Sequence, residues 1–295
     1  MKQITGVYPP IPTPFKGSEA VDYEGLKHNI DRWNREPLDG YVVMGSNSES
    51  VHLSLDEKIK ITAIARASAS SERKVIAGSG DQSTLATIET TQKLADAGAD
   101  AALVITPSFY KNQMNEDALF AHFTTVATRA PIPILLYNVP AYTGLDMPSE
   151  LIVRLAEHPN IVGVKESSGH MGKAASIIAA APGDFSFLTG TANSLLGALS
   201  LGASGGIMAL ANIAAVAIKK LIDAFNEGDL KRAAELQHTL VPVNMAITAE
   251  FGVPGLKAAM EKTGRCGGPP RLPLSSLNES GRARIQTILD AAGLL

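Results

Sequence analysis

Short runs of apolar residues recur along the first two thirds of the chain, and most of them are followed by a longer segment with an amphipathic pattern. Runs of this kind, rich in β-branched side chains, are typical of strands that are buried on both faces of a parallel sheet. The pattern predicts eight strands, at residues 6–9, 40–44, 74–77, 101–105, 132–137, 161–165, 185–189 and 205–208.

Several of the amphipathic segments begin with residues that cap helices. Asp22, Ser54 and Ser83 each precede such a segment, and Glu57 stands three residues after Ser54, as in a capping box. Strands and helices therefore alternate, with no linker rich in glycine, serine or charge between them. This alternation predicts an α/β fold, a (β/α)8 TIM barrel, rather than a doubly wound sheet.

The pattern changes to purely helical after the eighth run. Helices are predicted at residues 213–226, 230–250, 254–262 and 275–292, with a turn in the Gly/Pro-rich stretch 263–270. We therefore expect a barrel in residues 1–212 and a C-terminal helical extension in residues 213–295. The extension is expected to pack on the barrel, so that the two parts form a single structural unit.

The composition fits one soluble globular domain with a small-molecule partner. Of 295 residues, 45% are hydrophobic and 19% are charged, which is enough for a large core. The formal net charge is -3 and no block of Lys or Arg occurs, so no nucleic-acid partner and no anionic membrane partner are expected. The longest apolar stretches, such as residues 207–218, are interrupted by Asn212 and fall short of the roughly 20 residues of a membrane span.

Cysteine and histidine usage restricts the chemistry further. Cys266 is the only cysteine, which excludes an internal disulfide framework and a cysteine-based zinc cluster and suits a reducing compartment. The first residues lack the sections of a signal peptide, so a cytoplasmic protein is expected. The six histidines show neither H-x-H nor HExxH spacing, and no Walker or dinucleotide fingerprint occurs. We therefore expect neither a metal nor another cofactor.

Lys165 closes the sixth apolar run, and Tyr137 closes the fifth. In a barrel both side chains lie at the C-terminal mouth, where catalytic groups are found. Burial disfavours an ammonium group and lowers its pKa toward ~7, so that a free amine can attack a ketone to form an imine, with the phenol carrying protons. Two simpler interpretations stay open: Lys165 in an ion pair with a carboxylate, and Tyr137 bonded to a backbone carbonyl.

Other strand ends supply further polar groups. The hydroxyl groups of Ser46 and Tyr110 are candidates to extend the proton relay from Tyr137. The turns at residues 45–47 and 78–80 offer backbone N–H groups near helix starts, which suit a carboxylate as well as a phosphate.

These residues carry a family resemblance over essentially the whole chain. The chain resembles the dihydrodipicolinate synthase and N-acetylneuraminate lyase family of class I pyruvate aldolases in Tyr137-Asn138-Val139-Pro140, in Gly163-Val164-Lys165-Glu166 and in the hydroxyl-bearing loop after the second strand. The resemblance implies that Lys165 forms a Schiff base with pyruvate, that Tyr137 shuttles protons, and that Ser46 and Asn47 bind the pyruvyl carboxylate.

The same resemblance implies an assembly. Tyr110 is similar to a family tyrosine that reaches into a neighbouring subunit's site, although Phe109 beside it is an alternative for this position. A homotetramer, built as a dimer of dimers, is therefore expected.

Within the family, the chain resembles the 4-hydroxy-2-oxoglutarate aldolases, for example at residues 6–10, 130–146, 158–163 and 251–257. Ser167 fits their pattern after the lysine. Ser48 stands where the family loop usually has glycine, and Tyr142 stands where dihydrodipicolinate synthases carry an arginine for the second substrate. The expected substrate-binding residues are Asn47, Ser48, Ser167, Gly190, Ile207 and Tyr142.

The resemblance implies reversible cleavage of a 4-hydroxy-2-oxo acid, first of all 4-hydroxy-2-oxoglutarate, to pyruvate and an aldehyde, here glyoxylate. Three alternatives stay open. They are an aldolase or dehydratase acting on 2-keto-3-deoxy sugar acids, a dihydrodipicolinate synthase, and a non-catalytic protein that binds a 2-oxo acid.

Overall fold

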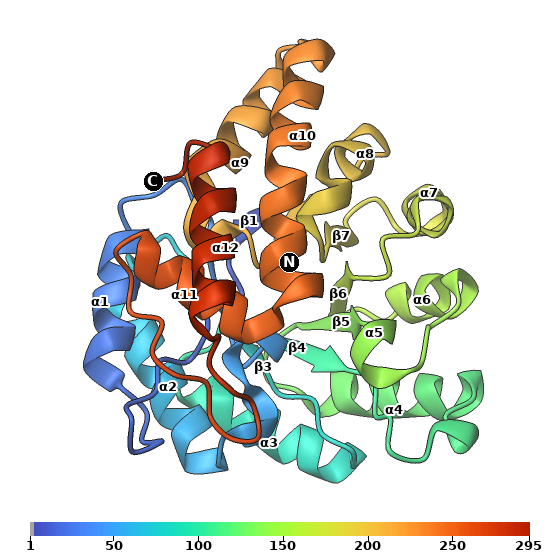
Figure 1. The fold of residues 1–295 in the computed structure, drawn as a ribbon. Coiled ribbons are helices and arrows are strands. Elements are labelled where there is room, and N and C mark those ends of the chain that lie inside the picture. The colour runs from blue at the N-terminus through green and yellow to red at the C-terminus, as the bar shows by residue number, and fades with distance from the viewer. Residues whose placement is uncertain (1–2) are drawn as a thin grey trace.

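Eight parallel strands form a barrel in the computed structural model, which describes residues 3–295 (Figure 1). Each strand pairs with its neighbours in sequence, β8 pairs with β1, and backbone bonds from Val42 to Pro9 and from Ile11 to Val42 join β1 to β2. The predicted barrel is therefore confirmed. The strands are β1 (Gly6–Tyr8), β2 (Gly40–Val43), β3 (Lys74–Gly78), β4 (Ala101–Ile105), β5 (Ile134–Asn138), β6 (Ile161–Glu166), β7 (Ser186–Thr189) and β8 (Gly205–Ile207).

Helices follow the strands and surround the barrel (Figure 1). The expected caps form: Asp22, Ser54 and Ser83 accept bonds from backbone N–H groups of the first turn, and Ser54 and Glu57 make a complete capping box. The helices are α1 (Tyr23–Trp33), α2 (Leu55–Ser68), α3 (Thr84–Asp96), α4 (Glu116–Arg129), α5 (Pro140–Thr143), α6 (Ser149–Ala156), α7 (Met171–Ala180), α8 (Leu195–Ser200) and α9 (Ala211–Asn226).

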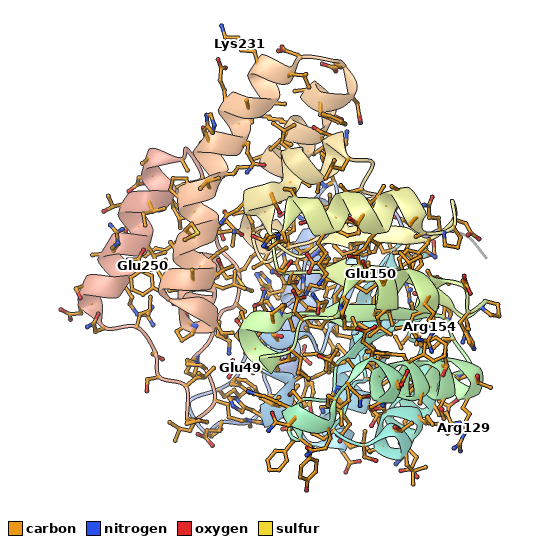
Figure 2. All side chains as sticks on the ribbon, turned by 90° about the vertical axis from the view of Figure 1, so that its right-hand side faces the viewer. Glu49, Arg129, Glu150, Arg154, Lys231 and Glu250 are labelled. Carbon is orange, nitrogen blue, oxygen red and sulfur yellow. The ribbon has the colours of Figure 1, made fainter. Side chains whose placement is uncertain are left out.

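The C-terminal segment comprises α10 (Leu230–Met245), a π-helical stretch (Ala246–Glu250), α11 (Gly252–Lys262) and α12 (Glu279–Ala291). The expected boundary after residue 212 falls inside α9, because β8 runs into this helix without a linker. Lys231 marks the outer tip of the α9–α10 pair, away from the strands (Figure 2). Between residues 3 and 295, no helix is long and apolar enough to cross a membrane.

Apolar side chains fill both the barrel and the layer between strands and helices. Alternate strand residues such as Val42, Leu103, Leu135 and Leu188 point inward and form one buried cluster, which also includes Tyr137. The opposite faces of the strands pack against the helices in two larger clusters. Side chains therefore fill the barrel interior. The site lies on top of this filled interior, at the carboxyl ends of the strands.

Candidate active site

Lys165 and Tyr137 are direct partners in the parallel pairing of β5 with β6. Each is the last residue but one of its strand, so both side chains point into the C-terminal mouth of the barrel. The Lys165 Nζ lies 4.1 Å from the centroid of the Tyr137 ring. The two groups that the sequence singled out are therefore in contact.

Lys165 is held in a form that suits a nucleophile. Its side chain is buried, with only 4% of the residue exposed, and burial lowers its pKa to about 7. Among residues 3–295, no carboxylate lies within ion-pair distance of its amine. The alternative interpretation of Lys165 as an ion-pair partner is therefore not supported, and desolvation acts on the amine without a compensating charge.

The neighbouring carboxylate, Glu166, is occupied elsewhere. Its Oε1 accepts a 2.7 Å bond from Asn138 Nδ2 and a 3.0 Å bond from the Ser168 N–H. The same amide group of Asn138 donates to Asp146 at 2.7 Å, and Lys173 forms ion pairs with both carboxylates. This network joins the ends of β5 and β6 and so fixes the spacing of Tyr137 and Lys165.

The phenol of Tyr137 shares a hydrogen bond with the hydroxyl of Ser46, with the two oxygens 3.2 Å apart. Burial raises the pKa of Tyr137, and the bond to Ser46 partly offsets this rise. Within the described part of the chain, Tyr137 Oη bonds to no backbone carbonyl, so the simpler interpretation of this residue is not supported. The phenol is protonated at neutral pH and can pass its proton through a hydroxyl partner.

Ser46 and Asn47 lie on a single 3-10 turn (Ser46–Ser48) directly after β2. Both side chains line the cavity above Lys165. Ser48 does not: it is buried, its hydroxyl donates to the Ile11 carbonyl at 2.5 Å, and its own carbonyl accepts from Thr13 at 2.8 Å. The expectation that Ser48 binds substrate is therefore not supported, because its side chain ties this turn to the loop after β1.

The turn also explains why serine is accepted where the family usually has glycine. Glycine is favoured where the backbone adopts a positive φ. Here the left-handed residue is the next one, Glu49, with a φ of 56°, and Ser48 itself has an ordinary conformation.

The cavity above Lys165 has a volume of about 590 Å3. Eight of the ten residues predicted for the site line it: Lys165, Tyr137, Ser46, Asn47, Ser167, Gly190, Ile207 and Tyr142. Of these, Ile207 is fully buried and forms an apolar part of the wall, whereas Tyr142 on α5 is 62% exposed and stands at the rim.

Ser167 and Gly190 meet at the ends of β6 and β7. A Cβ atom on Gly190 would lie only 1.8 Å from Ser167 Oγ, so this position requires glycine. The Ser167 hydroxyl is buried, forms no hydrogen bond of good geometry within the described chain, and lies close enough to the Tyr137 phenol to lower the pKa of that group. Because buried polar groups are rarely left unpaired, this hydroxyl is available for a ligand in the cavity.

Tyr110 does not line the cavity of its own chain. Tyr110 and Phe109 are 68% and 77% exposed, and their rings pack edge to face at 5.1 Å. The side chain of Gln82 holds this corner by accepting bonds from the N–H groups of Ser108 and Phe109, both at 2.8 Å. The role of Tyr110 in a neighbouring subunit's site stays a prediction, as does the choice between Tyr110 and Phe109.

Sequence analysis missed the wall that the C-terminal segment provides. Met245, Thr248 and Ala249 line the cavity from the end of α10 and the π-helical stretch, beside Thr191 and Asn193 of the loop after β7. Met245 and Asn193 are in contact, with the Asn193 amide 3.0 Å from the sulfur. A continuous helix over 230–250 was expected, and no residue in it has a chemical character that marks it as a cavity wall.

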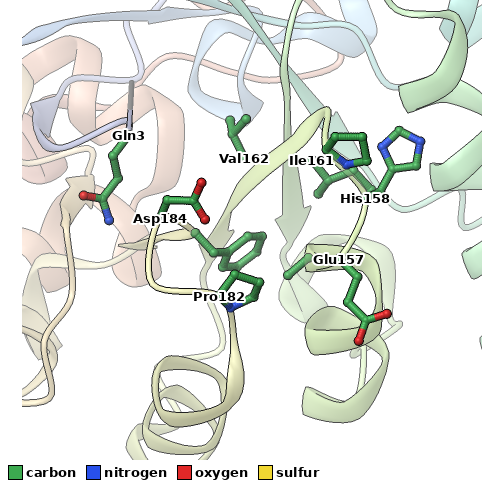
Figure 3. A pocket seen from close by; sticks show the side chains of 10 residues that line it. Gln3, Glu157, His158, Ile161, Val162, Pro182 and Asp184 are labelled. Carbon is green, nitrogen blue, oxygen red and sulfur yellow. The ribbon is translucent and has the colours of Figure 1, made fainter. Parts of the chain in front are cut away.

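A second cavity, of about 240 Å3, lies at the opposite end of the barrel (Figure 3). It is lined by residues that precede strands or begin them, among them Gln3, His158, Ile161 and Asp184. Barrel enzymes carry their chemistry at the C-terminal ends of strands. Among residues 3–295, neither a lysine nor a tyrosine lines this cavity, and we place the chemistry at Lys165.

The site can therefore perform amine chemistry on a carbonyl compound. It combines a desolvated amine, a phenol–hydroxyl pair for proton transfer and neutral polar groups for a substrate. Within residues 3–295, no three His, Cys, Asp or Glu side chains are gathered where they could hold a metal ion.

Similarity to known proteins agrees with this chemistry. A family model described as the dihydrodipicolinate synthetase family matches residues 3–292. The chain is 39% identical over 285 residues to a 4-hydroxy-tetrahydrodipicolinate synthase of Methanothrix thermoacetophila, covering 96% of this chain and 95% of that protein. It is 36% identical over 283 residues to the enzyme of the same name from Neisseria gonorrhoeae, covering 96% and 97%.

Solved structures show the same likeness. The structure of the dihydrodipicolinate synthase from Cyanidioschyzon merolae with lysine bound has a TM-score of 0.95, 30% sequence identity and full coverage of both chains. That of the Aquifex aeolicus enzyme has a TM-score of 0.93, 32% identity and 99% coverage of both. The chain therefore belongs to the dihydrodipicolinate synthetase family, whose members are class I, pyruvate-dependent carbon–carbon lyases.

Proposed function

We propose that this protein cleaves a 4-hydroxy-2-oxo acid, with 4-hydroxy-2-oxoglutarate as the first candidate, to pyruvate and glyoxylate. The observation that carries the proposal is the composition of the cavity: among the residues that the structure describes, Lys165 is the one basic side chain that lines it. The remaining polar groups are neutral hydroxyls and amides. Such a lining suits a small hydroxylated substrate that is held through its imine.

The first half of the reaction builds the imine. The neutral amine of Lys165 attacks the C2 carbonyl, and the resulting carbinolamine loses water to give a protonated imine. A pKa of about 7 leaves about half of the Lys165 side chains neutral at pH 7, against roughly one in 3,000 for an unperturbed lysine. Burial of Lys165 therefore raises the population of the nucleophile about a thousandfold.

The second half breaks the carbon–carbon bond. The C4 hydroxyl loses its proton, the C3–C4 bond cleaves, and its electron pair moves into the protonated imine to give an enamine and glyoxylate. A proton then returns to C3, and water hydrolyses the imine to release pyruvate and the free amine. The Tyr137–Ser46 pair is positioned to move these protons, since its oxygens are 3.2 Å apart beside Lys165.

Polar residues line the cavity on the side of the loop after β7, and they suit a small polar aldehyde as the second product. The hydroxyl of Ser167 lines the cavity, and Thr191 and Asn193 line it from the loop after β7. A substrate carboxylate or C4 hydroxyl that bonds Ser167 would satisfy a buried group that is otherwise unpaired. The residues that hold the aldehyde half therefore include Ser167.

Dihydrodipicolinate synthase activity is the second candidate, because the relatives named above carry that name. Against it stands Tyr142, at the position where the resemblance places a synthase arginine. Tyr142 lies at the rim of the cavity and lacks the guanidinium group that the resemblance assigns to the synthases at this position. A 2-keto-3-deoxy sugar acid aldolase or dehydratase shares the same first half-reaction and differs only in the second product.

A substrate panel separates these candidates. Purified protein is supplied in turn with 4-hydroxy-2-oxoglutarate, with 2-keto-3-deoxygluconate, and with pyruvate plus aspartate semialdehyde, while pyruvate formation or consumption is followed. We expect kcat/KM for 4-hydroxy-2-oxoglutarate to exceed that of the other reactions by at least about a hundredfold. Faster turnover of pyruvate with aspartate semialdehyde would show that the protein is a synthase.

We also propose a homotetrameric assembly in which Tyr110 contributes to a neighbouring subunit's site. The exposed aromatic pair of Phe109 and Tyr110 supports this, because large exposed apolar side chains are typical of interfaces. One similar solved protein is described as a monomeric dihydrodipicolinate synthase variant, so the assembly needs a direct test. Sedimentation of the wild type and of Tyr110→Ser should show a tetramer in the first case and smaller species in the second.

A further inference from the structure

Glu49 is a buried carboxylate next to the turn that bears Ser46 and Asn47, yet it does not line the cavity. Its backbone is left-handed, with a φ of 56°, and its N–H donates to the Ser46 carbonyl at 3.1 Å. A left-handed conformation is unfavourable for a residue with a Cβ and persists only where the surroundings hold it. The contacts of Glu49 therefore determine where the turn lies.

The partner of Glu49 comes from the C-terminal segment. Lys257 on α11 forms an ion pair with it at 2.6 Å, and the side chains of Lys257 and Glu49 are only 2% and 1% exposed. The Lys257 amine also donates to the Pro269 carbonyl at 2.9 Å and lies 4.5 Å from the ring centroid of Phe15. The ion pair thus joins residues more than 200 positions apart inside the protein.

Besides His52, whose Nδ1 lies 3.4 Å from Glu49 Oε2 within the same loop, a second group from the C-terminal segment contacts Glu49. The backbone N–H of Arg271 donates to the other carboxylate oxygen of Glu49 at 2.8 Å. The guanidinium group of Arg271 forms an ion pair with Glu57 and bonds to the His52 carbonyl. Residues 257–271 therefore contact the loop between β2 and α2 at several points.

The other side of the turn is held by the barrel. Thr13 donates to the Ser48 carbonyl, and the Ser48 hydroxyl donates to Ile11. The turn is thus clamped between the loop after β1 and the C-terminal segment. Because the Glu49 N–H donates to the Ser46 carbonyl at 3.1 Å, a displacement of Glu49 also moves Ser46.

A buried ion pair is a weak source of stability, because an apolar pair of the same volume is often as stable or more so. What such a pair supplies is a defined relative position, since either charge left alone in the interior is costly. The location of this pair matters here: it lies one residue beyond the turn whose Ser46 hydroxyl meets the phenol of Tyr137.

We propose that the Glu49–Lys257 ion pair is a positioning device, which holds Ser46 at hydrogen-bond distance from Tyr137 and so makes imine chemistry depend on the C-terminal segment. The inference rests on the proposed role of Lys165, Tyr137 and Ser46, but not on the identity of the aldehyde. Neither Glu49 nor Lys257 touches the substrate. Both act through Ser46.

The test compares Glu49→Gln with a matched control. Glu36→Gln removes the carboxylate of another ion pair between the barrel and the C-terminal segment, with Arg265, which is remote from the turn. The readout is the rate at which borohydride traps pyruvate on the protein, measured against pyruvate concentration, together with the unfolding midpoint. We expect Glu49→Gln to lower trapping at low pyruvate concentration by about tenfold or more, and Glu36→Gln to leave it within about twofold.

Coupling to Ser46 distinguishes positioning from general loosening. In a Ser46→Ala background, Glu49→Gln should lower trapping by less than about threefold, because the group it positions is already gone. Equal losses in both backgrounds would overturn the proposal. If the wild type traps pyruvate and Glu49→Gln behaves like Glu36→Gln, the proposal also fails, whereas a wild type that traps none would remove the proposed function itself.

A double variant without a charge at either position covers the case in which Glu49→Gln alone does not fold. The double variant Glu49→Gln/Lys257→Met leaves no uncompensated buried charge, so its stability should approach that of the wild type. We expect this variant to fold and yet to trap pyruvate slowly, because the ion pair then no longer fixes the turn on the side of the C-terminal segment. Recovery of both stability and trapping rate would show that the ion pair serves packing alone.

Discussion

The hydroxyl of Ser46 lies 3.2 Å from the phenol of Tyr137, although Ser46 follows β2, Tyr137 lies on β5, and the two residues are 91 positions apart in sequence. Tyr137 in turn lies against the amine of Lys165, its partner in the sheet. These contacts form a continuous route from a turn after β2 to the proposed nucleophile on β6. Each member of the route makes a separate prediction.

Replacing Tyr137 with phenylalanine tests the proton carrier. The ring that packs against Lys165 is retained, while the oxygen that bonds Ser46 is lost. Loss of a general acid–base group lowers kcat by about 100- to 10,000-fold, which steady-state assays of pyruvate release will measure. Tyr8→Phe is the matched control, because Tyr8 is another buried phenol of the barrel interior. Wild-type kcat in Tyr137→Phe would exclude the phenol from the reaction.

Ser167→Ala tests the aldehyde half of the site. The buried hydroxyl lines the cavity and makes no hydrogen bond of good geometry within the described chain, so we expect its removal to leave the fold intact. We expect kcat/KM for 4-hydroxy-2-oxoglutarate to fall about tenfold, while trapping of pyruvate stays within about twofold of wild type. Ser176→Ala, on the exposed face of α7, serves as control. Equal losses for both ligands would place Ser167 at the pyruvyl half instead.

The low pKa of Lys165 also makes a prediction about stability. The folded state releases the proton at about pH 7, and the unfolded chain releases it near 10.4. Between these values the unfolded state binds more protons, so the free energy of unfolding rises with pH, by up to about 1.4 kcal/mol per pH unit. The penalty is fully present below the folded pKa and disappears above the unfolded one.

Urea unfolding of wild type and Lys165→Met will measure this effect. We expect the wild type to gain about 2 kcal/mol relative to the variant between about pH 7.5 and about pH 9. Lys27→Met changes a lysine whose side chain is 46% exposed, and its curve should run parallel to the wild type. Parallel curves for Lys165→Met as well would show that the amine is not desolvated.

Much of this fold is visible in the sequence, because each buried strand is a local apolar run. All eight runs became strands, with ends that moved by two residues or fewer, and Asp22, Ser54 and Ser83 cap the helices they precede. Lys165 and Tyr137 were found for the same reason, since each closes a strand whose direction fixes where its side chain lies.

The rest of the site depends on contacts that no local pattern records. Thr248 and Ala249 reach the cavity because the helix after Leu230 changes to a π-helical stretch over the barrel mouth. The hydroxyl of Ser48, which was expected at the substrate, bonds to the distant Ile11 carbonyl instead of lining the cavity. Glu49 and Lys257 likewise form an ion pair although they are more than 200 positions apart in the sequence. Such long-range partners follow from tertiary packing and not from residue type or spacing.

The central claim is that Lys165 forms an imine with pyruvate, and borohydride reduction tests it directly. Wild-type protein treated with pyruvate and borohydride should gain the mass of one reduced pyruvyl group, located by peptide mass spectrometry on the segment that contains Lys165. Lys165→Ala should gain none under the same conditions. Absence of the adduct in the wild type, or its persistence in Lys165→Ala, would contradict the account.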